Sequence, residues 1–463
     1  MEERISPPDS DRAPLARREF IRTAGLYAGA AAVAPSLPGL LAWDRRGAER
    51  RTVPGYGGLR QAGPELELPE GFSYVKLGVQ GSPLSDGSPT PRAHDGMAAF
   101  GMDDGSIRLV RNHEDKDLPG VARVLGDARL AYDRRAGGGT TTLEIRVGAD
   151  GTPEIARDFV SLSGTVVNCA GGPTPWGSWL TCEEITWGTN REFDRPHGYV
   201  FEVPAAADEQ TPAVPLRDMG RFVHEAVAVD PATGIVYETE DVNRRSGFYR
   251  FTPRTPGRLV DGGTLEMLAI AGRPEADLRR GQRAGAWLPV EWVPIEDPDP
   301  AGAEADPSTV YNEGREKGGA RFSRLEGCWY GDGGIYFHST NGGDEQSGQV
   351  WRYVPEQDAL VLVFESPDSD VLESPDNLTV SPRGGLILCE DATGTSRLHG
   401  LTAEGEIFEF ARNILNGREF AGATFSPDGR ILFVNIQGDL DSFGPGNLGM
   451  TFAIRGPWEE GPL

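Results

Sequence analysis

The chain has 463 residues, a formal net charge of −25, 62 glycines and 36 prolines. This length is enough for a large core, and it fits either two or three average domains or one repeat architecture. The acidic excess excludes nucleic acid as a partner, because no basic stripe is present to neutralise phosphates, and it favours cations instead. Many turn-forming residues with ample apolar content predict a globular, mostly β chain rather than a disordered one.

Residues 1–42 are predicted to be a twin-arginine export signal. Arg17 and Arg18 stand just before an apolar pair, and a run of small and apolar residues follows. An amphipathic N-terminal helix is the alternative, whereas prolines make the run too short for a membrane span, and no other stretch could cross a bilayer. We therefore expect contact with the twin-arginine translocation machinery and a periplasmic or secreted mature protein. Residues 43–64 are expected to be a linker, and residues 65–463 the catalytic domain.

One pattern recurs along that domain: a short apolar strand, a turn with Asp or Pro and Gly, and a second strand with a polar end. The copies are HDGMAAFGMDDGSIRLVRNHED (94–115), VNCAGGPTPWGSWLTCEE (167–184), HEAVAVDPATGIVYETED (224–241), LEGCWYGDGGIYFHSTNGG (325–343), PDNLTVSPRGGLILCEDAT (375–393) and FAGATFSPDGRILFVNIQG (420–438). Several gaps between copies are close to the ~40–50 residues of a four-stranded propeller blade. The sequence therefore predicts an all-β fold, a β-propeller of six blades. Five or seven blades, or a pair of β-sandwich domains, are the alternatives, and the acidic, proline-rich segment 292–319 is predicted to be an insertion on one face.

The two ends of each hairpin are expected to place polar side chains together. Residues 14 or 15 positions apart about the turn face each other at the open end of an antiparallel hairpin, and in a propeller these ends share one face around the channel. The resulting pairs are Cys169 with Glu183 or Glu184, Glu225 with Glu240, Glu326 with Thr340, Asp376 with Glu390, and Ala421 with Asn435. The repeat thus predicts carboxylates and one thiol at a single mouth, with no acid from the last copy.

Crowded carboxylates repel one another unless cations neutralise them. Oxygen donors suit Ca²⁺ or Mg²⁺, whereas a thiolate suits a transition metal such as iron or zinc, so the sequence predicts a mixed metal site. Taken singly, each acid has the alternative of a solvated rim residue. The candidate ligands are Glu114, Cys169, Glu183, Glu184, Glu225, Glu240, Asp241, Glu326, Asp376 and Glu390. The residues expected to support them from behind are Asn112, His113, His224 and Asn377. His113 has the alternative of a packed polar residue, and His224 that of a ligand.

The remaining cysteines stand beside these acids along the strands. Because neighbours on a strand point to opposite faces, Cys182, Cys328 and Cys389 are predicted to be core residues of the blades. Two disulfides, with three possible connectivities, are the alternative for an exported protein.

The stretch RFSRLEG (321–327) places Arg324 beside the candidate ligand Glu326. A planar guanidinium next to metal ions forms a clamp for a phosphate or a carboxylate. Arg324 is therefore predicted to be the catalytic residue that binds substrate, with neutralisation of nearby carboxylates as the alternative.

Several of these stretches together resemble the PhoX-type alkaline phosphatases. They are RNHE, NCAGGPTPWGSWLTCEE, HEAVAVDPATGIVYETED, RFSRLEG and SPDNLTVSPRGGLILCED, which occur in the same order from about residue 65 onward, with the twin-arginine leader before them. The resemblance implies a six-bladed propeller, a mixed cluster of Ca²⁺ and Fe³⁺ at the channel mouth, and hydrolysis of phosphate monoesters, with diesters as a further substrate class. It also implies that Cys169 binds iron, that the carboxylates hold iron and calcium, and that Arg324 binds the phosphate.

We therefore expect a metal-dependent phosphatase that acts on small phosphate esters. The sequence has no G-x-S-x-G motif and no P-loop, so neither covalent serine hydrolysis nor nucleoside triphosphate chemistry is supported. A calcium-dependent propeller lactonase or esterase, and a calcium-binding propeller without catalytic activity, are the two alternatives.

Overall fold

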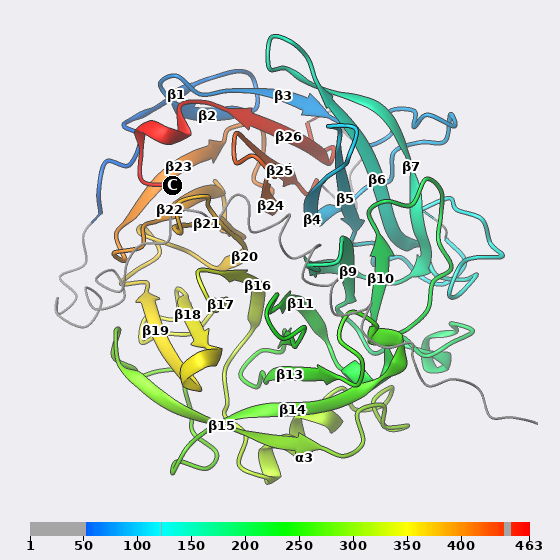
Figure 1. The fold of residues 1–463 in the computed structure, drawn as a ribbon, viewed down its shortest axis with the longest axis vertical. Coiled ribbons are helices and arrows are strands. Elements are labelled where there is room, and N and C mark those ends of the chain that lie inside the picture. The colour runs from blue at the N-terminus through cyan, green and yellow to red at the C-terminus, as the bar shows by residue number, and fades with distance from the viewer. Residues whose placement is uncertain (1–51, 122, 439–445) are drawn as a thin grey trace, which may run out of the picture.

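A computed structural model of the protein describes residues 52–121, 123–438 and 446–463. Strands surround a common centre (Figure 1), and hydrogen bonds join them into five sheets. The predicted export signal, residues 1–42, lies outside the described residues. Within the described ranges, no helix has the length and hydrophobicity that crossing a membrane requires. The predicted all-β, propeller-like arrangement is confirmed.

Six antiparallel hairpins line the centre of the molecule (Figure 1). Their inner strands are β4 (His94–Gly101), β8 (Asn168–Pro173), β11 (His224–Val229), β16 (Leu325–Gly331), β20 (Pro375–Val380) and β24 (Phe420–Phe425). Their second strands are β5 (Ile107–His113), β9 (Ser178–Glu183), β12 (Val236–Glu240), β17 (Gly334–Ser339), β21 (Leu386–Glu390) and β25 (Ile431–Ile436). Each inner strand contacts the inner strands before and after it, and β24 contacts β4, so the ring is closed.

Further strands extend the hairpins outward. They are β1 (Leu59–Gln61), β2 (Leu66–Pro69), β3 (Ser73–Leu77), β6 (Gly138–Val147), β7 (Pro153–Thr165), β10 (Val200–Pro204), β13 (Phe248–Pro253), β14 (Gly263–Ile270), β15 (Trp287–Ile295), β18 (Gln349–Val354), β19 (Ala359–Glu365), β22 (Arg397–Leu401), β23 (Ile407–Asn413) and β26 (Met450–Arg455). Because β15 pairs with both β14 and β19, two hairpins share one nine-stranded sheet. The count of six blades therefore stays a prediction.

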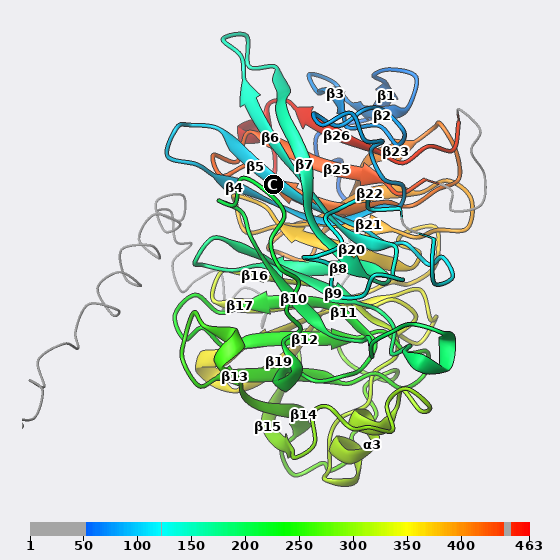
Figure 2. The same cartoon turned by 90° about the vertical axis from the view of Figure 1, so that its right-hand side faces the viewer.

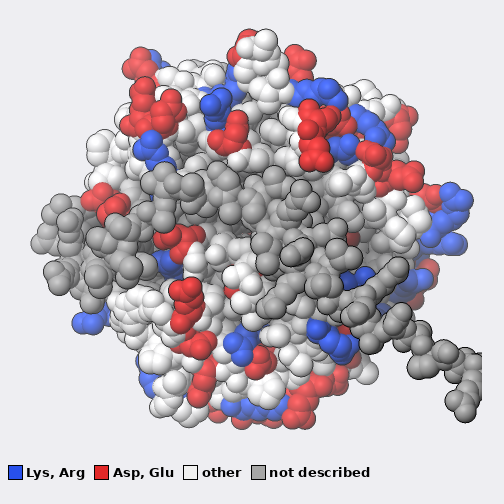
Figure 3. All heavy atoms as spheres, viewed as in Figure 1, with Lys and Arg blue, Asp and Glu red and all other residues white. Residues whose placement is uncertain are grey.

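The ring is also closed at its outer edge, by a strand from early in the chain. β3 pairs antiparallel with β26, so it completes the four-stranded sheet that contains β24 and β25. The α-helix α3 (Thr309–Glu316) lies at the opposite end of the molecule from β1 and β3 (Figure 2). On the face seen in Figure 3, acidic and basic side chains alternate around the rim.

Two of the predicted segments contain secondary structure. Within the expected linker, β1 pairs with β2, so these residues belong to a sheet. The expected insertion at 292–319 begins inside β15 and then includes α3. Proline has no backbone N–H group and is therefore disfavoured in a strand that has neighbours on both sides. In β15, Pro289 pairs only with β19 and Pro294 pairs only with β14, so each proline has a paired strand on one side alone.

The hydrophobic core lies between the sheets and includes three of the four cysteines. Cys182, Cys328 and Cys389 are buried in three separate apolar clusters, and all four cysteines are free thiols. The core position predicted for these three residues is confirmed, and the structure contains no disulfide among the described cysteines.

Candidate metal centre

All six hairpins share one register beside the channel. In each, the first residue of the inner strand pairs with the last residue of the second strand, and a β-bulge in the inner strand follows. The extra residue of a bulge bends the strand and redirects side chains. The residues directly after these pairs are Asp95 with Glu114, Cys169 with Glu184, Glu225 with Asp241, Glu326 with Thr340, Asp376 with Asp391, and Ala421 with Gln437. Most of them line one pocket.

Glycine lets the inner strands approach closely beside these positions. A Cβ on Gly96 would lie 2.6 Å from the Cα atom of Ala170, and a Cβ on Gly327 would lie 2.8 Å from the carbonyl oxygen of Asp376. No side chain fits such gaps, so the neighbouring strands pack backbone against backbone. As a result, donor atoms from different sheets lie close together.

These donors surround a cavity of about 220 Å³, which we call the central pocket. It is lined by Asp95, Glu114, Lys116, Cys169, Glu184, Arg324, Glu326, Asp376, Asp391, Glu419 and Gln437. Three overlapping groups have donor atoms within 4.8 Å of one another: Asp95, Glu114 and Cys169; Cys169, Glu184 and Glu225; and Glu225, Glu326 and Asp376. Cys169 and Glu225 each belong to two groups, so the donors form a continuous chain.

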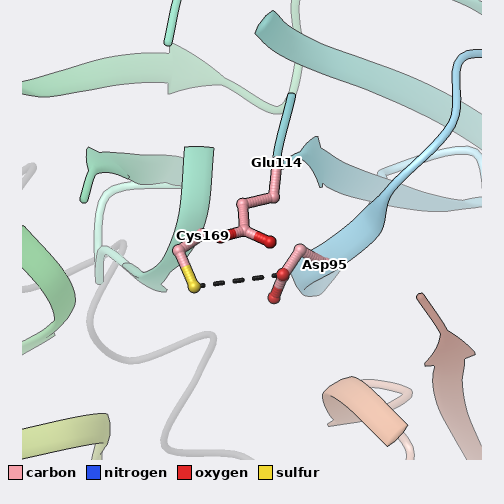
Figure 4. Close-up of side chains that lie close together, drawn as sticks. All are labelled: Asp95, Glu114 and Cys169. Carbon is pink, nitrogen blue, oxygen red and sulfur yellow. Dashed lines mark hydrogen bonds between the residues drawn. The ribbon is translucent and has the colours of Figure 1, made fainter. Parts of the chain in front are cut away.

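Cys169 lies at the junction of two of these groups. Its Sγ is 3.3 Å from Glu225 Oε1 and 3.9 Å from Asp95 Oδ2, and Figure 4 shows the side chains of Asp95 and Glu114 turned towards it. Behind it, the Asn112 amide donates hydrogen bonds to the carbonyl oxygens of Cys169 and Ala170 at 3.0 and 2.8 Å. Asn112 therefore holds the backbone of the strand that carries Cys169.

Burial and mutual repulsion act strongly on the pocket acids. Burial raises the pKa of Asp95, Glu184, Glu225 and Glu326 well above the usual range, and neighbouring carboxylates raise each of them further. Burial likewise raises the pKa of Asp376 to about 7 and that of the Cys169 thiol well above its usual value. Glu225 Oε2 and Asp376 Oδ1 are buried and have no hydrogen-bond partner among the described residues. Bound cations would supply both the missing positive charge and the missing partners, so the donor set fits metal ions.

We expect protein treated with a chelator to lose stability as the pH rises. The pocket acids have folded-state pKa values above those of the unfolded chain, so the folded protein binds more protons and its free energy of unfolding falls with increasing pH. The window opens near the ordinary carboxyl pKa of about 4 and, for Asp376, extends through its folded pKa of about 7. Thermal melts in EDTA between about pH 5 and about pH 8 should show this fall. Melts with calcium and iron present should be flatter, and equal slopes would contradict the prediction.

Arg324 is held at the edge of the pocket by two carboxylates. Its Nη2 lies 2.9 Å from Asp241 Oδ2 and 2.6 Å from Glu326 Oε1, and its Nε donates to Asp241 Oδ1 at 3.1 Å. Burial would lower the pKa of Arg324, but these carboxylates outweigh it and raise the pKa above the usual value. Asp241, predicted as a ligand, is outside the three donor groups and orients Arg324 instead.

Three predicted ligands point away from the pocket, and their assignment is corrected. Glu183 accepts hydrogen bonds from His197 at 2.6 Å and from the backbone of Gly198 and Tyr199. Glu240 accepts from Tyr249 and Gly247, both at 2.9 Å. Glu390 accepts from His399 and from the Glu373 backbone, also at 2.9 Å. Each is the last residue of its strand, and the next residue, Glu184, Asp241 or Asp391, is the one nearer the channel.

The two histidines predicted to support the ligands are likewise engaged elsewhere. His113 lies between the carbonyl oxygen of Arg92 at 2.8 Å and Thr141 Oγ1 at 2.9 Å. His224 lies 3.1 Å from the Gly220 carbonyl oxygen and 3.3 Å from Glu238. Both are buried packed residues. Asn377 is buried on β20, where its backbone lies against Gly327.

Five pocket residues were missing from the predicted set: Asp95, Lys116, Asp391, Glu419 and Gln437. Gln437 Nε2 donates to Asp95 Oδ2 at 2.9 Å and to Glu114 Oε2 at 2.6 Å. An alignment of the inner-strand starts HDG, NCA, HEA, LEG, PDN and FAG would have placed Asp95 beside Cys169 and Glu225. Lys116 and Glu419 lie outside the repeat, so the repeat offers no signal for them.

The neighbours Glu183 and Glu184 provide a matched pair of variants. Burial would lower the pKa of His197, but its ion pairs with Glu183 and Asp133 raise it to about 9. This contribution to stability is present below the unfolded pKa of about 6.5 and is lost as the pH rises through about 9. At pH 7 we expect Glu183→Gln to lower the free energy of unfolding by about 3 kcal/mol, since it breaks a buried ion pair, and to leave the metal content unchanged.

Glu184→Gln should do the opposite. It removes one of several repelling acids from the central pocket, so chelator-treated protein should keep its stability while the bound metal falls. Denaturant unfolding and elemental analysis of both variants will measure this contrast. Metal loss in Glu183→Gln with retention in Glu184→Gln would reverse the assignment.

Comparisons with known proteins identify the family of the chain. The sequence matches the family described as alkaline phosphatase PhoX over residues 56–439. No curated protein matches it at a significant level. The solved structure of Pseudomonas fluorescens PhoX in complex with vanadate, a transition state analogue, has 19% identity and a TM-score of 0.65, covering 89% of this chain and 98% of that one. A gluconolactonase from Xanthomonas campestris has 14% identity and a TM-score of 0.41, covering 86% and 99%. The Pseudomonas likeness shows a shared fold, and the family match extends across most of the chain. The chain therefore belongs to the alkaline phosphatase PhoX family.

Proposed function

We propose that the protein is a metal-dependent phosphatase that hydrolyses phosphate monoesters at a mixed calcium and iron cluster in the central pocket. The observation that carries the proposal is the chain of three overlapping donor groups directly beside Arg324. The proposed ligands are Asp95, Glu114, Cys169, Glu184, Glu225, Glu326 and Asp376. Family membership supports the reaction class, namely phosphoric ester hydrolysis.

The donor atoms support two kinds of ion. The two groups that share the Cys169 thiol suit iron, because a thiolate is a soft ligand. The group of Glu225, Glu326 and Asp376 offers only carboxylate oxygens and suits calcium. Glu225 belongs to one group of each kind, so it could serve as a ligand in either group.

The protein's own contribution to the reaction is orientation and charge. When bound, the metal ions act as Lewis acids that draw charge from the phosphoryl oxygens. Arg324 lines the same pocket with its guanidinium and is suited to hold one non-bridging oxygen. Asp241 fixes the guanidinium before substrate arrives, so its donors are already aimed where charge develops.

A substrate panel with elemental analysis tests this function. We expect purified protein to contain iron and calcium and to hydrolyse p-nitrophenyl phosphate, with slower turnover of bis-p-nitrophenyl phosphate. Chelation should abolish both activities, and calcium with iron should restore them. Turnover of a lactone with calcium alone would show a lactonase instead. Calcium-dependent melting without turnover of any ester would show a binding propeller.

Export through the twin-arginine route to the periplasm or the medium is the proposed localisation, supported by the Arg17 and Arg18 leader. Replacement of both arginines by lysine should retain the protein in the cytoplasm, as cell fractionation will show. Unchanged export of the double variant would contradict the proposal.

A further inference from the structure

We propose that Lys116 is a second phosphate-binding cation of the central pocket, flexible where Arg324 is fixed, and that it makes the enzyme prefer monoesters to diesters. This inference rests on the proposed phosphatase function and names the substrate class that the pocket selects. Of the described residues that line the pocket, Lys116 and Arg324 are the cations.

The chain uses lysine rarely, which makes this position unusual. Of its 45 basic residues three are lysines, Lys76, Lys116 and Lys317, and the others are arginines. The lysine ammonium is a compact charge on a flexible side chain, whereas the arginine guanidinium is planar and rigid. Lys116 is therefore the cation of the pocket whose side chain can adjust to the position of a substrate oxygen.

Ion pairs on both sides of Lys116 fix the loop that carries it beside the pocket. Arg92 Nη2 pairs with Asp115 Oδ1 at 2.8 Å and with Asp117 Oδ1 at 2.7 Å, and Arg123 holds the other oxygen of Asp117 at 2.6 Å. The residues on both sides of Lys116 are thus fixed to the same guanidinium. Lys116 points away from them and its Nζ reaches Glu114 Oε1 at 2.6 Å.

The charge environment of Lys116 leaves it available to a ligand. Its side chain is 48% exposed, whereas that of Glu114 is 3% exposed, so the ammonium lies between the buried donors and the opening. The Lys116 ammonium forms an ion pair with Glu114 and lines the pocket together with Glu184 and the Cys169 thiol. An ammonium has three N–H donors, and its pair with Glu114 uses one of them.

The two ester classes differ at the oxygen that such an ammonium would bind. A monoester dianion carries two negative charges over three non-bridging oxygens. A diester carries one charge over two such oxygens and has a second ester group in place of the third. We assign two of the non-bridging oxygens to the metal ions and Arg324. Lys116 would then bind mainly the third non-bridging oxygen, which only the monoester has. Loss of Lys116 should therefore harm monoester turnover selectively.

The test compares Lys116→Met, Lys116→Arg and the control Lys317→Met in metal-loaded full-length protein. Lys317 pairs with Glu313 and Glu296 at the end of α3, away from the pocket. Since a charge-assisted hydrogen bond is lost, we expect Lys116→Met to lower kcat/KM for p-nitrophenyl phosphate about 30-fold and for the bis ester less than about 3-fold. Calorimetric binding of inorganic phosphate should weaken about tenfold. Metal content should not change, Lys116→Arg should recover most of the loss, and Lys317→Met should match the unmodified protein.

Three results for Lys116→Met would overturn the assignment: an equal fall in kcat/KM for both esters, no fall in kcat/KM, or loss of bound metal. Loss of metal would show that Lys116 serves the metal site instead. If the unmodified protein hydrolyses neither ester, the phosphatase function fails, and the phosphate titration decides the role of Lys116 alone. Weaker phosphate binding by Lys116→Met would then still support it. Equal binding, or no phosphate binding by the unmodified protein, would overturn it.

Discussion

Replacement of Cys169 by alanine is expected to remove iron from the protein and to abolish phosphatase activity. The Cys169 thiol belongs to two of the three donor groups, and its backbone is held by Asn112, so no neighbouring residue can take its place. Because bound metal supplies several kcal/mol of charge stabilisation in the transition state, the loss in kcat should exceed about 10³-fold. Elemental analysis and p-nitrophenyl phosphate turnover of the same preparation will measure both effects.

Two further cysteine variants sharpen this experiment. Cys169→Ser keeps the size of the side chain and replaces sulfur by a hard oxygen donor, so it should retain calcium while losing iron. Cys182→Ala is the matched control, since Cys182 lies on β9 of the same sheet and is packed in the core. It should cost about 1 kcal/mol of stability and keep its metal. Full iron and full turnover in Cys169→Ala would show that the thiol is no ligand.

Replacement of Arg324 by methionine is expected to lower kcat/KM for monoesters by about 10³-fold, since a charged donor held in place before the reaction is lost. Metal content should be retained, because Arg324 forms an ion pair with the donor Glu326 and hydrogen bonds with Asp241, and is not itself a metal ligand. Arg324→Lys should recover a small part of the activity, since it keeps the charge but not the two-pronged geometry. Steady-state kinetics on metal-loaded protein will measure these effects.

Arg321 provides the control for this variant. It lies in the same RFSRLEG stretch, but its guanidinium donates to the Arg244 carbonyl oxygen at 2.7 Å and does not line the central pocket. Arg321→Met should therefore retain activity. If Arg324→Met lost only stability or metal, with unchanged kcat/KM per bound metal, then Arg324 would only neutralise its neighbouring carboxylates.

The propeller and most of the donor set, namely six of its seven residues, could be predicted from the repeat because each copy marks its own turn. Cys169, Glu225, Glu326 and Asp376 occupy equivalent places before those turns, and the structure brings all four to the channel. On the second strands, the equal offset from the turn led to Glu240 and Glu390. Each of these residues comes one position before the residue that lies nearer the channel. The β-bulge in each inner strand adds a residue that simple pairing does not include.

Other residues were missed for different physical reasons. The first hairpin is longer than the others, so Asp95 lies 19 positions before Glu114 and does not match the offset of the remaining copies. Glu114 was predicted from its own strand end, whereas Asp95 was missed. Lys116 is placed by a network of ion pairs around Arg92, which depends on contacts between distant parts of the chain. Hydrophobic patterning carries no information about such contacts.

The closure of the ring has a consequence for biosynthesis. The sheet that contains β24 is completed by β3, and the central pocket takes Asp95 from near the start of the chain and Gln437 from near its end. A growing chain on the ribosome therefore lacks the hydrogen bonds from Gln437 to Asp95 and Glu114 until its final sheet has been made. We therefore expect metal ions to bind a finished fold and not a nascent one.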